Sequence, residues 1–117
     1  MTIWQGTLPR FQYVEATAAN LTLTDSATPY LVTVVDRDAF VFSFVNNTDK
    51  EIEIMLVNPD DPSNTKRLFN RIAPGFGFSS ETLNAGGIFT IPGKTKVYTH
   101  ARGVAVSSGS FKLFIWG

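Results

Sequence analysis

The chain lacks cysteine altogether, has a single histidine and carries few charges. Without cysteine, disulfides and thiolate metal sites are excluded. Charged residues make up 17% of the chain and the formal net charge is zero. Because no basic run could neutralise a string of phosphates, we expect neither nucleic-acid binding nor a polybasic membrane patch. No stretch approaches the roughly 20 apolar residues that a membrane-spanning helix needs.

The N-terminus, MTIWQGTLPRF, has no basic start followed by an apolar run, so a secretory leader is not expected. The chain has 117 residues, of which 44% are apolar, and this is typical of one compact globular domain. Residues 1–8 contain too few strand signals to form part of a core. We therefore expect an N-terminal arm over residues 1–8 and a single domain over residues 9–117.

Groups suited to catalysis are scarce. His100 follows an expected strand and precedes a turn, where a surface or hydrogen-bonded role is favoured over that of a catalytic base. No G-x-S-x-G elbow occurs. The carboxylates Asp36 and Asp38, and Asp60 and Asp61, stand in expected turns, which favour aspartate for its own backbone hydrogen bonds; calcium binding and glycosidase chemistry are the alternatives. We assign no catalytic, cofactor-binding or metal-binding residue and expect no enzyme.

Short apolar and β-branched runs recur with turn residues between them, and no window of helical length shows a clean i, i+3, i+4 apolar pattern. The sequence therefore predicts an all-β chain. Roughly eight short strands at close spacing favour an antiparallel two-sheet β-sandwich that is jelly-roll-like. The expected strands lie near residues 9–15, 20–24, 30–35, 39–45, 51–57, 66–72, 86–91, 95–100 and 110–116.

Three connections have recognisable turn chemistry. Residues 46–50, NNTDK, join two strong strands, and Asn and Asp tolerate the left-handed backbone of a tight reversal. Pro92 and Gly93 stand at the centre of IPGK, the pattern of a type II turn. Residues 58–65, NPDDPSNT, are polar and rich in turn residues, so we expect a loop that projects from one end of the fold. Loops of this kind often carry contacts.

Three strands are apolar on both faces: residues 30–35 (YLVTVV), 39–45 (AFVFSFV) and 111–116 (FKLFIW). A strand of a sandwich normally turns apolar residues inward and polar residues outward. The segment EIEIML at residues 51–56 obeys this rule, with its isoleucines and leucine on one face and its glutamates on the other. The other face of the three strands needs a cover, which is either a part of the same chain or another protein chain.

The second half of the chain carries a series of strand and turn boundaries. A strand ends in NNT at residues 46–48, and the segments IMLVNP (54–59), IAPG (72–75), LNAGG (83–87), IPGKTKVY (91–98) and WG (116–117) follow. Over roughly residues 40–117, this order resembles the small all-β virion proteins of tailed bacteriophages, including capsid decoration (cement) proteins.

The resemblance implies a structural role. Such proteins bind the assembled capsid at symmetry axes or between major capsid subunits, often as trimers, and they belong to virions that assemble in the host cytoplasm. An apolar outer face would be buried at such an interface, and Trp4 in the N-terminal arm would act as an aromatic anchor. The candidate interface residues are Trp4, Leu8, Phe11, Val41, Val45, Phe114 and Trp116.

A carbohydrate-binding module is the alternative. The chain contains ten Phe, three Tyr and two Trp, and aromatic rings can form a platform for sugars. Phe dominates, however, and it lacks the polar handle that Tyr and Trp supply. Phenylalanine at strand period is more typical of a core.

Overall fold

The computed structural model describes residues 11–22, 25, 27–39, 41–79 and 91–116. Eight strands and one short 3-10 helix account for the regular structure of these residues. The strands are β1 (Phe11–Thr17), β2 (Tyr30–Val34), β3 (Val41–Asn46), β4 (Ile52–Val57), β5 (Lys66–Ile72), β6 (Gly77–Ser79), β7 (Lys96–His100) and β8 (Ser110–Trp116), and the 3-10 helix η1 is Ala18–Leu21.

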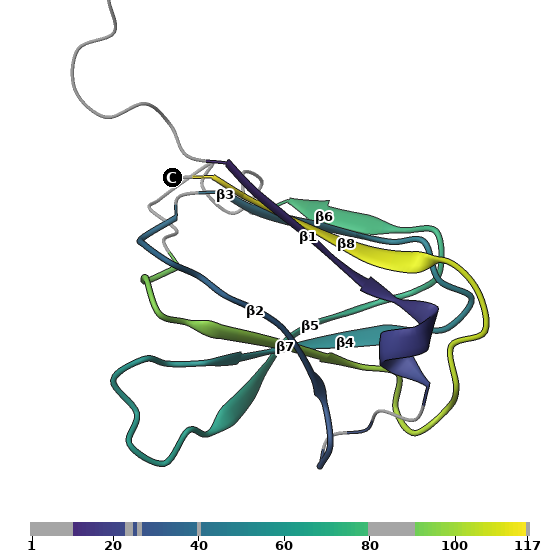
Figure 1. Cartoon of the computed structure of the whole chain (residues 1–117), viewed down its shortest axis with the longest axis horizontal. Helices are drawn as coiled ribbons and strands as arrows, with labels where there is room; N and C mark the ends of the chain where they lie inside the picture. Colours follow the sequence, from purple (N-terminus) through teal and green to yellow (C-terminus); the bar gives the residue numbers. More distant parts are fainter. Residues whose placement is uncertain (1–10, 23–24, 26, 40, 80–90, 117) are drawn as a thin grey trace, which may run out of the picture.

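The strand pairs are nested: the first strand pairs with the last, the second with the second-last, and so on towards the middle of the sequence. β1 pairs with β8, β2 with β7, β3 with β6 and β4 with β5, all antiparallel. The result is two four-stranded sheets, which we name sheet A (β1-β8-β3-β6) and sheet B (β2-β7-β4-β5). They pack face to face as a sandwich (Figure 1). This nested order is that of a jelly roll, so the predicted fold class is confirmed.

The core lies between the two sheets and is centred on aromatic rings. Phe44 of β3 is fully buried, and its ring centroid lies 5.1 Å from that of Phe78, 5.6 Å from that of Phe111 and 6.3 Å from that of Phe69. These four rings come from strands of both sheets, so they bind the sheets together. Aliphatic residues complete the core: Ile52, Ile54, Ile72, Val97, Leu113 and Ile115.

Two strand predictions differ from the structure. The strand expected at 20–24 is wrong in its described part, because η1 occupies Ala18–Leu21; residues 23 and 24 lie outside the described residues. In η1 the side-chain Oδ1 of Asn20 accepts hydrogen bonds from the N–H and the hydroxyl of Thr17, both at 2.9 Å. These local bonds stabilise the start of η1. β6 was not predicted, since it has three residues and begins with glycine. The strand expected at 86–91 lies outside the described residues except for Ile91, which forms a bridge with Ala39.

The turn at Pro92 is shifted by one residue from its predicted position. Thr95 donates its N–H to the carbonyl of Pro92 at 3.3 Å, and Lys94, not Gly93, has a positive φ of 74°. Gly93 is required for another reason: a Cβ at this position would lie 2.7 Å from the Cα of Arg37. Its N–H donates to Oδ1 of Asp38 at 2.8 Å. Asp38 therefore stabilises the turn at Pro92 through Gly93, 55 residues away from it, and not the local backbone that the sequence favoured.

The loop between β4 and β5, residues 58–65, extends from one end of the sandwich, as predicted (Figure 1). Its aspartate Asp61 accepts hydrogen bonds from the N–H groups of Ser63 at 2.9 Å and Thr65 at 3.1 Å. These bonds lower the pKa of Asp61. The carboxylate thus fixes the loop's own backbone.

The reversal at residues 46–50 is held by side chains and not by left-handed backbone. The non-glycine residues with positive φ in the described part are Asn64, Lys94 and Arg102. Instead, the fully buried Asn46 donates its side-chain amide to the carbonyls of Lys50 at 2.8 Å and Ile72 at 2.9 Å. Its Oδ1 accepts from the N–H of Thr48 at 3.0 Å and from its hydroxyl at 2.6 Å. One side chain therefore joins the end of β3 to the end of β5.

Asp49 ties the same reversal to the connection between β7 and β8. Its carboxylate accepts hydrogen bonds from the hydroxyl of Ser107 and, at 3.0 Å, from the N–H of Ser107. These bonds, and to a lesser extent those from Lys50, hold the pKa of Asp49 far below its usual range. Nearby, Gly109 has a φ of 83°, and a Cβ on it would lie 1.9 Å from the carbonyl oxygen of Asn47. The two connections are in contact and admit no larger residue there.

We expect Asn46→Ala to lower the free energy of unfolding by about 2–4 kcal/mol, because the Ile72 carbonyl and the Thr48 N–H lose this partner at a buried site. The Lys50 carbonyl keeps the hydroxyl of Thr48 at 2.9 Å. Asn47→Ala, at the exposed neighbouring position, is the matched control and should change the free energy by less than about 0.5 kcal/mol. Urea unfolding of the three proteins measures both values. Equal losses for the two variants would contradict the role given to Asn46.

We expect the folding stability of the chain to depend on pH through the carboxylate of Asp49. Its pKa is lower in the folded chain than the unfolded value of about 3.9, so its stabilisation is complete above that value and is lost as the pH falls through and below about 4. We expect Asp49→Asn to lower Tm at neutral pH, with a difference from wild type that shrinks below about pH 4. Asp60→Asn, which changes the charge equally in the loop 58–65, should show no such trend. A difference independent of pH would refute this role.

Candidate interface surfaces

The predicted interface residues fall into three groups. Trp4 and Leu8 lie outside the described residues. The backbones of Phe11, Val41 and Trp116 are described, and they lie side by side, since Trp116 of β8 pairs with Phe11 of β1 and with Val41 of β3. The remaining two residues, Val45 and Phe114, are described in full. The sheet register thus brings five predicted residues together on three neighbouring strands of sheet A.

On the outer face of sheet A, Phe114 packs against Tyr13, its partner in the register. Their ring centroids are 5.1 Å apart, and Tyr13 is 42% exposed. The Tyr13 hydroxyl donates to the carboxylate of Glu15, and this hydrogen bond raises the pKa of Tyr13. Val45 is half-buried and pairs with Lys112. The described side chains of this face are therefore mixed, with the Tyr13–Phe114 pair beside charged residues.

The outer face of sheet B carries a longer apolar surface, which we name the sheet B row. Leu31, Tyr98, Met55 and Leu68 are consecutive partners in the register across all four strands. Leu31 is 41% exposed and Leu68 is 55% exposed, while Met55 is buried. The ammonium of Lys66 lies 5.1 Å from the centre of the Tyr98 ring. Val34, 40% exposed, adds to the apolar area next to Leu31.

Sequence reasoning did not select the sheet B row. The apolar character of residues 30–35 on both faces did point to Leu31 and Val34, which the structure leaves exposed. Met55 offered a further signal, because in EIEIML it shares a strand face with the two glutamates. Leu68 gave no such signal, since it follows the charged residues Lys66 and Arg67 on the edge strand β5. The row itself depends on which strands pair, and this is not visible in the sequence.

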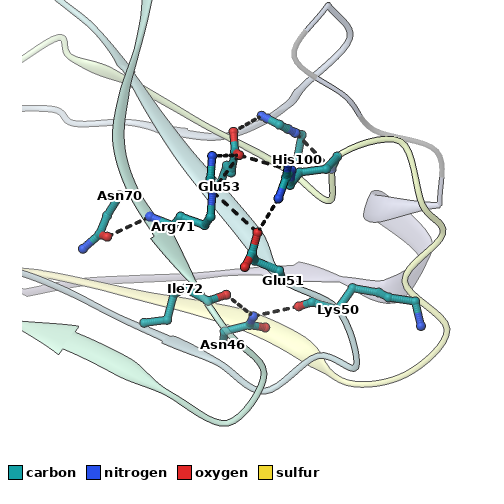
Figure 2. A network of polar contacts seen from close by, with 9 residues as sticks. Asn46, Lys50, Glu51, Glu53, Asn70, Arg71, Ile72 and His100 are labelled. Carbon is teal, nitrogen blue, oxygen red and sulfur yellow. Dashed lines mark hydrogen bonds and ion pairs between the residues drawn. The ribbon is translucent and has the colours of Figure 1, made fainter.

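Beside the row, sheet B carries a charged cluster centred on Glu53 (Figure 2). The Oε1 atom of Glu53 lies 2.8 Å from Nη2 of Arg71, and 3.5 Å from Nε of Arg102. Glu51 lies 2.9 Å from Nη1 of Arg102 and 3.5 Å from Nε of Arg71. The side chain of Glu53 is only 13% exposed. Two carboxylates and two guanidinium groups therefore neutralise one another across three neighbouring segments.

His100 forms the inner side of this cluster. Its side chain is 3% exposed, so the surface alternative is wrong and the hydrogen-bonded alternative is confirmed. Nδ1 accepts a hydrogen bond from the N–H of Arg102 at 3.1 Å. Nε2 lies 3.0 Å from Oε2 of Glu53, but the geometry of this contact is not that of a hydrogen bond. The imidazole thus packs against the carboxylate that binds both arginines.

Within the described residues, no group of three His, Asp or Glu side chains is placed to hold a metal ion. The same residues include no helix that is long and apolar enough to cross a membrane. No protein-family model matches the chain, and no curated protein matches it in sequence.

Glu53→Gln should destabilise the fold by about 1–3 kcal/mol, because it weakens the ion pairs of a carboxylate that is largely removed from water. The effect is smaller than for a fully buried pair, since the two arginines are about half exposed. Glu51→Gln removes a more exposed carboxylate from the same cluster and should cost less than about 1 kcal/mol. Chemical denaturation gives both values. A larger loss for Glu51→Gln would contradict the central place of Glu53.

Proposed function

We propose that this chain is a non-enzymatic virion structural protein of the capsid decoration type. It packs on or between major capsid subunits and associates with copies of itself, in our proposal as a trimer. In this role its location is the virion, which assembles in the host cytoplasm. The observation that carries the proposal is the sheet B row, a line of apolar residues that crosses all four strands on the outer face of sheet B.

Each sheet of a sandwich has one face in the core, and the other face is normally polar. In sheet B the outer face instead presents Leu31, Leu68 and Val34, each at least 40% exposed. Apolar side chains grouped on one face mark a site where another protein binds. Since the row lies on strands and not on loops, it offers a rigid surface suited to a permanent contact.

The fold is compatible with this role, although a fold does not define a function. Jelly rolls are common in viral capsid proteins. The charged cluster around Glu53 and His100 is internally neutralised, so it does not oppose an apolar contact beside it. The resemblance of residues 40–117 to phage decoration proteins points in the same direction.

A carbohydrate-binding module is the second candidate. Jelly rolls also occur in lectins, and the exposed ring of Tyr13 beside Phe114 offers an aromatic surface with a hydroxyl. Against it, that hydroxyl already donates to Glu15. This candidate predicts a monomer whose tryptophan fluorescence changes when an oligosaccharide is added.

The native mass of the purified chain, measured by light scattering at several salt concentrations, tests the proposal. We expect a trimer that persists up to about 1 M salt, where the Debye length is only about 3 Å, because an apolar interface is not screened. Leu31→Asp should convert it to a monomer. Val104→Asp, at an exposed apolar residue in the connection between β7 and β8, should leave it intact.

Dissociation of the wild-type trimer by salt would contradict an apolar interface. Equal dissociation by Leu31→Asp and Val104→Asp would remove the sheet B row from the interface. A monomer that responds to a panel of oligosaccharides would favour the carbohydrate-binding candidate.

A further inference from the structure

An apolar pocket of about 300 Å³ opens at the end of the sandwich where β4 ends and β5 begins. Its volume is at the lower end for pockets that bind small molecules, so it suits one large side chain. Arg67 is the one charged side chain among the described residues that line it. The apolar lining consists of Leu56, Phe69 and Ile91, with Pro59, Leu68 and Pro92.

The lining indicates the chemistry of the occupant. Two proline rings, a phenylalanine and aliphatic side chains favour a flat apolar group. The guanidinium of Arg67 can stack on the face of an aromatic ring, and tryptophan is the best partner for this contact. Tryptophan also buries more apolar area than most side chains and dominates many interfaces. An indole therefore fits the pocket better than a charged or aliphatic group.

The chain supplies such a group close by. Ile91, in the pocket wall, is hydrogen-bonded to Ala39 by a pair of 2.8 Å backbone bonds. Two residues further, Val41 pairs with Trp116, and Trp116 pairs with Phe11 at the start of β1. The path from Phe11 to the pocket wall is therefore roughly 20 Å long. It consists of two spacings between paired strands, two residues along a strand and the bridge from Ala39 to Ile91.

The N-terminal arm is long enough to span this path, and Trp4 is the aromatic residue within residues 1–10. Trp4 is seven residues before Phe11, and an extended chain of that length reaches roughly 23–25 Å. Leu8, three residues before Phe11, reaches only about 10 Å, which is shorter than this path. Figure 1 shows β1 beginning at the same end of the sandwich as the loop 58–65, which contributes Pro59 to the pocket.

We propose that the pocket is the binding site for the indole of Trp4 from the same chain. A tethered indole has an effective concentration in the millimolar range, which favours the chain's own arm over that of another copy. Docking requires neither a capsid nor a second copy, so it stands or falls separately from the proposed function.

The first test follows the fluorescence of Trp4 in the full chain. Trp116→Phe makes Trp4 the sole tryptophan, since the chain contains two. We expect a blue-shifted emission and quenching by acrylamide that is several-fold weaker than in the urea-unfolded chain. In this background, Pro59→Asp puts a charge into the pocket and should restore solvent-like emission and quenching. Pro62→Asp, in the same loop but outside the pocket lining, is the matched control and should leave both unchanged.

Solvent-like emission before any pocket substitution would overturn the proposal. An identical response to Pro59→Asp and Pro62→Asp would do so too. Because both prolines are exposed, we expect both variants to fold, and circular dichroism checks this. Should Trp116→Phe or Pro59→Asp fail to fold, the test below decides the matter without either change.

The second test uses the absence of natural cysteine. In the double variant Gln5→Cys with Asn58→Cys, docking brings the two thiols together, because Asn58 lines the pocket and Gln5 follows Trp4. Mild oxidation should give an intrachain disulfide, seen as a monomer band of altered mobility without reductant. Gln5→Cys with Ser63→Cys is the control and should stay reduced. A disulfide-linked dimer, or equal oxidation of the two variants, would refute docking of the chain's own arm.

Discussion

The hydrogen bonds of Asn46 are the constraint on which the two-sheet arrangement depends. Aromatic and aliphatic contacts hold the sheets together, but such contacts are not directional and tolerate sliding. A buried amide has no such freedom, because each donor and acceptor that loses its partner carries the full cost of desolvation. All the bonds of Asn46 are made only when the end of β3, the reversal at 46–50 and the end of β5 meet in one geometry.

Other polar groups around the core also have specific partners. Asp49 attaches the connection between β7 and β8 to the same reversal, and Gly109 allows the two backbones to touch. On the outer face of sheet B, Glu53 and Glu51 pair with Arg71 and Arg102, and their charges cancel beside the imidazole of His100. The described outer face of sheet B is thereby divided into a charged part with satisfied partners and an apolar part without a cover.

For two turn residues, the local sequence pattern predicts a role that contacts with distant parts of the chain change. Gly93 was assigned the left-handed position of its turn, but the approach of Arg37 requires a residue without Cβ there, and Lys94 adopts the positive φ instead. Asn46 looked like a turn residue and is a buried cross-link. In both cases the deciding partner is more than 20 residues away in the sequence, so no local pattern contains it.

The sequence by itself determined the strand class and the approximate position of most strands, because an alternation of period two is a local property of the chain. It also determined that several strands are apolar on both faces. Only the tertiary structure decided the strand order, and with it which residues share a surface. Leu31, Tyr98, Met55 and Leu68 form one row because β2, β7, β4 and β5 are neighbours in sheet B. Such long-range pairing is set by the packing of the whole core.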